Sequence, residues 1–130
     1  MIVADSDVLI DYLRNSGPMA ARVEVELQSR SFATTAVTAA ELWAGARSPR
    51  QLAAVETVLG AMAILPLDVA AARKGGEVRR ELLLRGEDIG MADCLIAGIC
   101  ISRDCMLLTR NRRHFERIPG LTLTYTVEPD

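Results

Sequence analysis

The sequence predicts an α/β protein, a three-layer α/β/α sandwich around a central, mainly parallel sheet of four to five strands. Short apolar segments alternate with longer helical segments along the chain, which favours crossover connections between parallel strands. The apolar segments are continuous, as expected for strands covered on both faces. The chain has 130 residues and half of them are apolar, so we expect one domain over residues 1–130.

The first elements are a strand, two helices and a second strand. The apolar residues 2–4 predict a buried strand, and acidic residues end it. A helix over residues 8–14 follows, and the segment 15–18, Asn-Ser-Gly-Pro, ends it. Residues 20–29 show a second helical pattern, and residues 32–35, with Phe and two Thr, have strand character.

The middle of the chain predicts two more helices, a third strand and a long helix. A threonine opens the third helix, over residues 38–45. A serine followed by proline is typical of a helix start, so the fourth helix covers residues 49–60. Residues 63–65 form the third predicted strand, and Asp68 caps a helix over residues 69–84.

The last part of the chain predicts an apolar helix over residues 89–102, a strand over 106–109 and an edge strand over 121–125. Gly75 and Gly76 lie inside the preceding long helix, where glycine weakens helical structure. The sequence alone offers no reason for these two glycines.

Acidic residues lie where the functional groups of such a sheet are expected, beyond the carboxyl ends of the strands. Asp5 and Asp7 directly follow the first strand, and Arg110 and Asn111 follow the strand over 106–109. We expect Asp5 in the functional site, because a carboxylate at the end of a buried strand is costly without a partner. Asp7 is interpreted as a cap of the next helix, with a structural role.

Glu41 has two interpretations. Together with Thr38 it forms a capping-box pattern, in which both side chains bond the backbone at a helix start. Residues 36–43 are otherwise mostly apolar, and a glutamate embedded there is either fully hydrogen bonded or directed at a cation. Both interpretations stay open at this point.

Asp93 lies in the first turns of the apolar helix over residues 89–102, which we expect to be buried. Asp88 is predicted to cap this helix. No Lys or Arg lies one helical turn from Asp93 on either side, and a buried, ionised aspartate needs a cation. We therefore expect Asp93 to be a functional acid that binds a metal ion.

Several acids without bases beside them are typical of a divalent-metal site. Oxygen ligands suit Mg²⁺, with Mn²⁺ as an alternative, and such sites commonly cleave phosphoesters. His114 and the 3 cysteines show no zinc-binding spacing. The odd number of cysteines argues against a disulfide framework. Reduced thiols are the simplest interpretation of Cys94, Cys100 and Cys105.

The charge and hydropathy of the chain limit the kinds of partner that we expect. The net charge of −2 does not by itself indicate nucleic-acid binding. The arginines near the end of the chain are better suited to phosphate, although a solvated helical face explains them equally well. The longest stretch without a charge, residues 57–67, is far shorter than the roughly 20 residues of a membrane-spanning helix. We therefore expect a cytoplasmic protein that does not bind membranes.

Four segments of the chain resemble the motifs of the PIN-domain family. They are residues 2–10 (IVADSDVLI), 38–42 (TAAEL), 92–97 (ADCLIA) and 107–115 (LLTRNRRHF), and they occur in the family's order. The length and layout are most similar to the VapC toxins of bacterial and archaeal toxin–antitoxin pairs.

This resemblance implies a PIN-like fold and a Mg²⁺-dependent endoribonuclease that often acts on transfer or ribosomal RNA. The implied catalytic residues are Asp5, Glu41, Asp93 and Asn111, with Asp5 and Asp93 as metal ligands. The resemblance also implies a homodimer that a VapB-type antitoxin inhibits.

Under this interpretation, Arg110, Arg112 and Arg113 become candidate RNA contacts, because a guanidinium pairs well with phosphate. Two positions differ from the familiar pattern. Asp7 stands where Asn or Ser is common, and Asn111 stands where many relatives carry Asp. An amide supplies an oxygen but no charge, so we expect a second metal ion to bind weakly.

Two alternatives remain. A HAD-type phosphatase would also begin with an apolar strand and an Asp-x-Asp pattern, but it requires a lysine after the later Ser or Thr. The only lysine, Lys74, precedes Thr109, so this order fails. The other alternative is a catalytically weak PIN-like module that binds RNA or protein, and Asn111 is the reason to consider it. Metal-dependent turnover of RNA separates this module from a nuclease.

Overall fold

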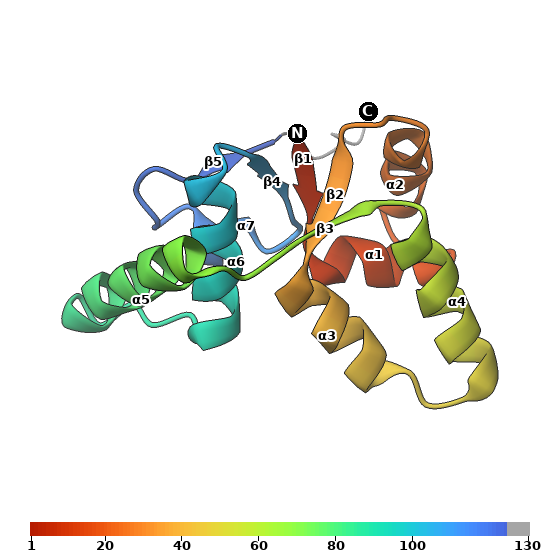
Figure 1. Cartoon of the computed structure of the whole chain (residues 1–130), viewed down its shortest axis with the longest axis horizontal. Coiled ribbons are helices and arrows are strands. Elements are labelled where there is room, and N and C mark those ends of the chain that lie inside the picture. Colours follow the sequence, from red (N-terminus) through yellow and green to blue (C-terminus); the bar gives the residue numbers. More distant parts are fainter. Residues whose placement is uncertain (125–130) are drawn as a thin grey trace.

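The computed structural model describes residues 1–124 and confirms the predicted α/β/α sandwich (Figure 1). Within these residues, one parallel sheet has the strand order β3-β2-β1-β4-β5. The strands are β1 (Ile2–Ala4), β2 (Phe32–Thr35), β3 (Ala63–Leu65), β4 (Met106–Leu108) and β5 (Thr122–Leu123). The edge strand expected over 121–125 is shorter than predicted, and Tyr125 lies outside the described residues.

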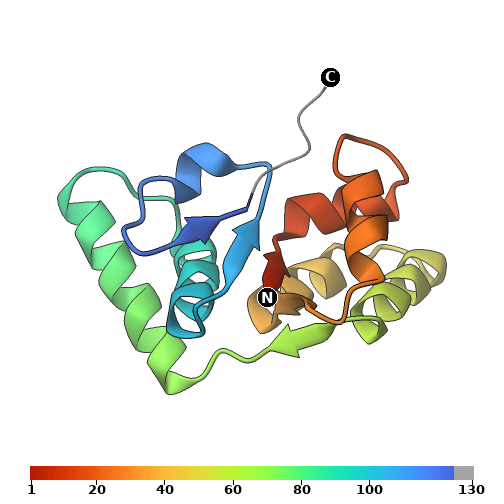
Figure 2. The same ribbon diagram turned by 90° about the horizontal axis from the view of Figure 1, so that it is seen from above.

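Helices cover both faces of the sheet (Figure 2). Helices α1 to α4 lie on one side, and α5 to α7 lie on the other. The helices are α1 (Ser6–Leu13), α2 (Ala20–Leu27), α3 (Ala36–Gly45), α4 (Pro49–Gly60), α5 (Val69–Leu84), α6 (Met91–Ser102) and α7 (Arg112–Phe115). In the described part of the chain, no helix is long and apolar enough to cross a membrane.

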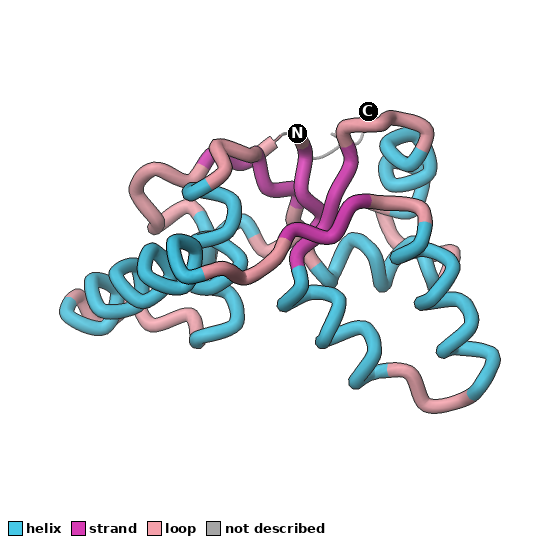
Figure 3. Tube along the Cα trace, in the orientation of Figure 1, coloured by secondary structure: helices cyan, strands magenta, loops and turns pink. Residues whose placement is uncertain are grey.

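The register of the central strands shows which residues lie together at the carboxyl edge of the sheet. Ala4 of β1 pairs with Thr34 of β2 and with Leu108 of β4, so β1 and β4 end at the same level and β2 ends one residue further on. The tube view shows these strands meeting at the middle of the molecule (Figure 3). The backbone N–H of Asp5 donates to the Leu108 carbonyl at 3.0 Å. The residues that follow β1 and β4 are therefore neighbours.

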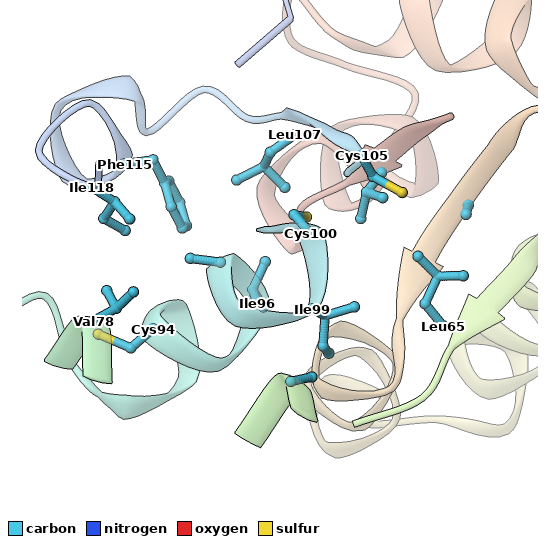
Figure 4. Packing of buried hydrophobic residues seen from close by; sticks show 14 of the residues in the cluster. Leu65, Val78, Cys94, Ile96, Ile99, Cys100, Cys105, Leu107, Phe115 and Ile118 are labelled. Carbon is cyan, nitrogen blue, oxygen red and sulfur yellow. The ribbon is translucent and has the colours of Figure 1, made fainter. Parts of the chain in front are cut away.

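Each face of the sheet has its own apolar core. On the α5–α6 side, one buried cluster includes Leu107 of β4, Ile96 and Ile99 of α6, and Phe115 of α7 (Figure 4). All three cysteines are free and buried in this part of the molecule. Burial raises the pKa of the Cys100 thiol to about 12, which keeps it protonated and unreactive at neutral pH.

Close packing of α5 against α6 explains Gly75. A Cβ at Gly75 would lie 2.9 Å from the carbonyl oxygen of Cys94, so no larger residue fits between the helices. Gly98 of α6 faces Gly75 and leaves equally little space. Nothing lies within 4 Å of a Cβ at Gly76, so the structure gives no reason for that glycine.

Three predicted helix starts were wrong. The first helix begins at Ser6, and Asp5 rather than Asp7 caps it. The third helix begins at Ala36, because Thr35 at the end of β2 has the extended backbone that a cap needs and accepts the Thr38 N–H at 3.0 Å.

Helix α6 begins at Met91 instead of residue 89, with Gly90 at its cap position. Asp88 accepts the Gly90 N–H at 2.9 Å, so it orders the preceding turn and does not cap the helix. The predicted caps Ser48 and Asp68 are confirmed, since their side chains accept the N–H groups of Gln51 and Ala71.

Candidate active site

Thr109 connects the two acids that follow β1. Its hydroxyl donates to Asp5 Oδ2 at 2.8 Å and lies 3.4 Å from Asp7 Oδ2. The N–H of Asn111 donates back to the Thr109 hydroxyl oxygen at 3.0 Å. Thr109 thus fixes the carboxylate of Asp5 at the carboxyl edge of the sheet.

The Asp5 carboxylate is only 5% exposed. Burial raises its pKa to about 7, and the charges of Asp7 and Asp93 contribute in the same direction. The bonds from Thr109 and from the Ser6 N–H lower this pKa, but they do not offset burial. Asp5 therefore occupies a place where negative charge is in excess and a cation would bind.

Asp7 lies in the first turn of α1, beside Asp5. Its Oδ2 accepts the Arg110 N–H at 3.1 Å. Its Oδ1 is buried and has no hydrogen-bond partner within residues 1–124. Burial raises the pKa of Asp7 as well. The interpretation of Asp7 as a helix cap is wrong, because it contacts the β4–α7 loop across the site.

Glu41 does not form the predicted capping box. It is exposed on α3, one helical turn beyond Thr38, and no hydrogen bond or ion pair holds its carboxylate in the described part of the chain. Partial burial is the main cause that raises the pKa of Glu41, and the charge of Asp93 raises it further. The capping-box interpretation of Glu41 is therefore wrong, and because the side chain is exposed rather than embedded, its role toward a cation stays a prediction.

Asp93 lies in the first turn of α6 and is less buried than predicted, with 23% of its side chain exposed. Asp93 is partly exposed because it lies at the N-terminal end of α6, next to α7, and not in the buried middle of the helix. Its Oδ2 lies 3.2 Å from Nδ1 of His114, and the same Nδ1 lies 2.8 Å from the Asn111 amide nitrogen. The structure thus brings Asp93 and Asn111 together through His114.

The candidate RNA contacts differ in their surroundings. Arg110 Nε pairs with Asp11 Oδ2 at 3.1 Å, and Arg112 Nη1 donates to the Thr124 carbonyl at 2.8 Å. Arg113 is exposed, and none of its contacts within residues 1–124 is an ion pair or hydrogen bond. Of the three arginines, Arg113 is therefore the one whose guanidinium is not already held by another residue in the described part of the chain.

The four acids interact electrostatically without forming a closed cage. The charge of Asp93 affects the pKa of both Asp5 and Glu41. No group of three or more His, Cys, Asp or Glu side chains between residues 1 and 124 lies close enough to be a ready metal site. The donor chemistry still fits a hard divalent cation, because Asp7 has an unpaired buried oxygen and the site carries excess negative charge.

A groove leads away from Glu41 between α1, α3 and α4. Its volume is about 270 Å³. Most of its lining is apolar and includes Ile10, Leu13, Leu42, Ala54 and Val55, with Glu41 as an acidic member. The apolar groove and the acidic site therefore share Glu41 at their boundary.

Residues 2–121 match the PIN domain, and the chain belongs to the PIN-domain family. A relative from Shigella flexneri, the tRNA(fMet)-specific endonuclease VapC, is 34% identical over 90% of this chain and 91% of its own length. Ribonuclease VapC19 from Mycobacterium tuberculosis is 34% identical over 96% of this chain and 100% of its own length.

Solved structures agree with these relatives. The DNA-bound VapBC structure from Salmonella typhimurium superposes with a TM-score of 0.83 and 31% identity, covering 95% of this chain and 96% of that one. VapBC2 from Rickettsia felis gives a TM-score of 0.83 and 25% identity over 95% and 98% of the two chains. Membership in this family favours a nuclease over the HAD-type phosphatase.

Proposed function

We propose that the chain is a divalent-metal-dependent endoribonuclease and the toxin of a VapBC-type pair, acting in the cytoplasm, where its RNA substrate is. The observation that carries this proposal is the pair of Asp5 and Asp7, joined through Thr109 at the carboxyl edge of the sheet, with Asp93 near enough to raise the pKa of both Asp5 and Glu41. The relatives named VapC support the same activity.

Asp5 and Asp93 would hold the ion, Mg²⁺ or Mn²⁺. When bound, this ion supplies an activated water and neutralises charge on the phosphate. Thr109 orients the Asp5 carboxylate, and Asp7 adds negative charge beside it. Glu41 is exposed to substrate, and its raised pKa suits a group that takes up or releases a proton during cleavage. Asn111 adds a neutral amide at the same edge.

RNA would approach over the β4–α7 loop. Arg113 is free to contact phosphate, and we assign it the first role in RNA binding. Arg110 and Arg112 keep exposed faces of 45% and 34% beside their partners, so they can add further contacts. These residues position the backbone of the RNA, and they do not read its sequence.

A VapB-type antitoxin would occupy the groove between α1, α3 and α4. Structures of relatives are VapBC complexes, and an amphipathic segment suits an apolar groove. A basic residue of the antitoxin at the Glu41 end would neutralise the acids. Val8 and Leu9 of α1 contribute nothing to this partner surface, because both are completely buried in the core of the chain.

A homodimer is part of the same proposal. Trp43 of α3 and Ile64 of β3 are apolar side chains with exposed fractions of 43% and 38%, and a second copy could cover such residues. Sedimentation at tens of micromolar tests this part separately, and a monomer would remove it.

RNA cleavage by the purified chain tests the proposal. Cleavage of labelled RNA should require Mg²⁺ or Mn²⁺, stop with EDTA and return when metal is added. Asp93→Asn should reduce cleavage by at least about a hundredfold, since it removes a ligand charge. Glu81→Gln, an exposed acid on α5, is the matched control and should cleave like the wild type. If the wild type and Asp93→Asn cleave RNA equally, the nuclease proposal fails, and the alternative of a catalytically weak PIN-like module that binds RNA or protein remains.

A further inference from the structure

His114 occupies an unexpected position in the acidic site. Its Nδ1 lies 3.2 Å from Asp93 Oδ2 and 2.8 Å from the side-chain nitrogen of Asn111. The side chains of His114 and Asp93 are 43% and 23% exposed, so an ion from solvent can reach both. His114 therefore joins a predicted metal ligand to the residue that replaces the usual fourth acid.

These two contacts converge on one position of the imidazole ring. A ring nitrogen carries either a proton or a lone pair in the ring plane. A proton can be donated to Asp93, whereas a lone pair can accept from the Asn111 amide, but one Nδ1 cannot do both. Rotating the Asn111 amide by 180° would present its oxygen to this point, since the two ends of an amide are assigned from their partners.

A cation would satisfy all three groups at once. It would take the Nδ1 lone pair, a carboxylate oxygen of Asp93 and the amide oxygen of Asn111. We propose that His114 is a nitrogen ligand of the metal site, and that this mixed donor set makes the chain prefer Mn²⁺ or a later first-row ion over Mg²⁺. The inference rests on the proposed function and specifies which ion that function uses.

The preference follows from ligand chemistry. Mg²⁺ takes oxygen ligands and keeps several waters, whereas imidazole suits transition-metal ions. Asn111 supplies no charge, so an ion at this end of the site depends more on the strength of each remaining donor. The link to Asp5 is electrostatic, because the charge of Asp93 affects the pKa of Asp5. Asp93 would thus contribute to the metal site both beside Asp5 and beside His114.

The composition of the chain makes a direct test simple. His114 is the only histidine. In the full chain, with any histidine tag removed, an imidazole nitrogen signal from bound Mn²⁺ can arise only from His114. Electron spin-echo envelope modulation on the Mn²⁺-loaded wild type should show this nitrogen. Since this measurement uses the wild type, it does not depend on the folding of a variant.

Metal titrations complete the test. His114→Gln keeps a polar side chain but removes the imidazole, and it should lose the nitrogen signal and weaken Mn²⁺ binding by about tenfold or more. Mg²⁺ binding should change much less, so the ratio of the two affinities falls. Glu81→Gln should keep both the signal and the ratio.

Two results would overturn the inference. If Mn²⁺ binds the wild type without a nitrogen signal while EDTA-sensitive cleavage persists, His114 is not a ligand, although the proposed nuclease stands. If neither metal binds and EDTA does not affect RNA, the proposed function fails together with the inference.

Discussion

The carboxyl of Asp5 combines deep burial with a like charge beside it. A buried aspartate next to Asp7 can keep its charge only when a cation or several donors compensate it. The hydroxyl of Thr109 and the N–H of Ser6 supply two donors, yet the pKa of Asp5 stays near 7. At the scale of single residues, burial and the neighbouring charge of Asp7 therefore disfavour the ionised form of Asp5, and a bound cation would favour it.

The stability of the metal-free protein should therefore fall as pH rises from about 4 to about 7. The pKa of Asp5 in the folded state is about 7, compared with its ordinary value of 3.8. Over this interval the folded state keeps a proton that the unfolded state has released, so higher pH favours unfolding. Asp5→Asn cannot titrate, and its free energy of unfolding should depend less on pH.

Urea unfolding in EDTA at about pH 5 and about pH 7.5 measures this difference. Parallel pH dependences for the wild type and Asp5→Asn would show that Asp5 ionises normally. Glu81→Gln should follow the wild type, because its side chain is exposed.

The sequence singles out Asp5 and Asp93 as candidates because each is an acid in an apolar setting, which is an unusual local pattern. Thr109 and His114 were missed for a common reason. Their roles come from strand register and from the short turn of α7, which places His114 one turn after Asn111. A hydroxyl after a strand, or one histidine in a basic segment, has no local feature that indicates such contacts.

At the scale of elements, the strands were predicted well because each is a short segment of apolar or threonine residues between helical segments, even though Ala63 and Ile64 of β3 are exposed. The helix starts were predicted less well. Residues 35–38 contain two threonines, and only the backbone conformation at Thr35 decides which of them caps α3. The α5–α6 contact could not be predicted from two adjacent glycines, since either could face the neighbouring helix.

Substituting these two glycines should have opposite effects. Gly75→Ala places a methyl group 2.9 Å from the Cys94 carbonyl oxygen and should destabilise the fold by about 1–3 kcal/mol. Gly76→Ala meets nothing within 4 Å and should stabilise α5 by about 0.5–1 kcal/mol. Thermal unfolding of the two variants beside the wild type tests this. Similar melting temperatures for both would mean that α5 and α6 do not pack as described.

At the scale of the whole molecule, the acidic edge of the sheet and the apolar groove are parts of one surface. Glu41 lies in both, because α3 connects the carboxyl end of β2 to the wall of the groove. A segment that fills the groove would end beside the acids and exclude RNA from them. A single arrangement of α1, α3 and α4 could therefore serve both cleavage and its inhibition.

Two adjacent alanines of α4 allow this link to be tested. Both are exposed, but Ala54 lines the groove and Ala53 does not. An arginine at position 54 would place a long, charged side chain in the groove and block an apolar partner segment. Ala54→Arg should therefore cleave RNA like the wild type yet resist inhibition by the proposed VapB-type antitoxin. Ala53→Arg should remain fully inhibited, since its side chain points away from the groove lining.

Growth of cells that express each variant together with this antitoxin gives the readout, and inhibition of purified enzyme gives a second one. We expect growth to stop with Ala54→Arg and to continue with Ala53→Arg and with the wild type. Asp93→Asn combined with Ala54→Arg should be harmless, which would attribute the toxicity to cleavage. If the antitoxin neutralises Ala54→Arg as well as the wild type, it binds elsewhere, and the groove between α1, α3 and α4 does not control the acidic site.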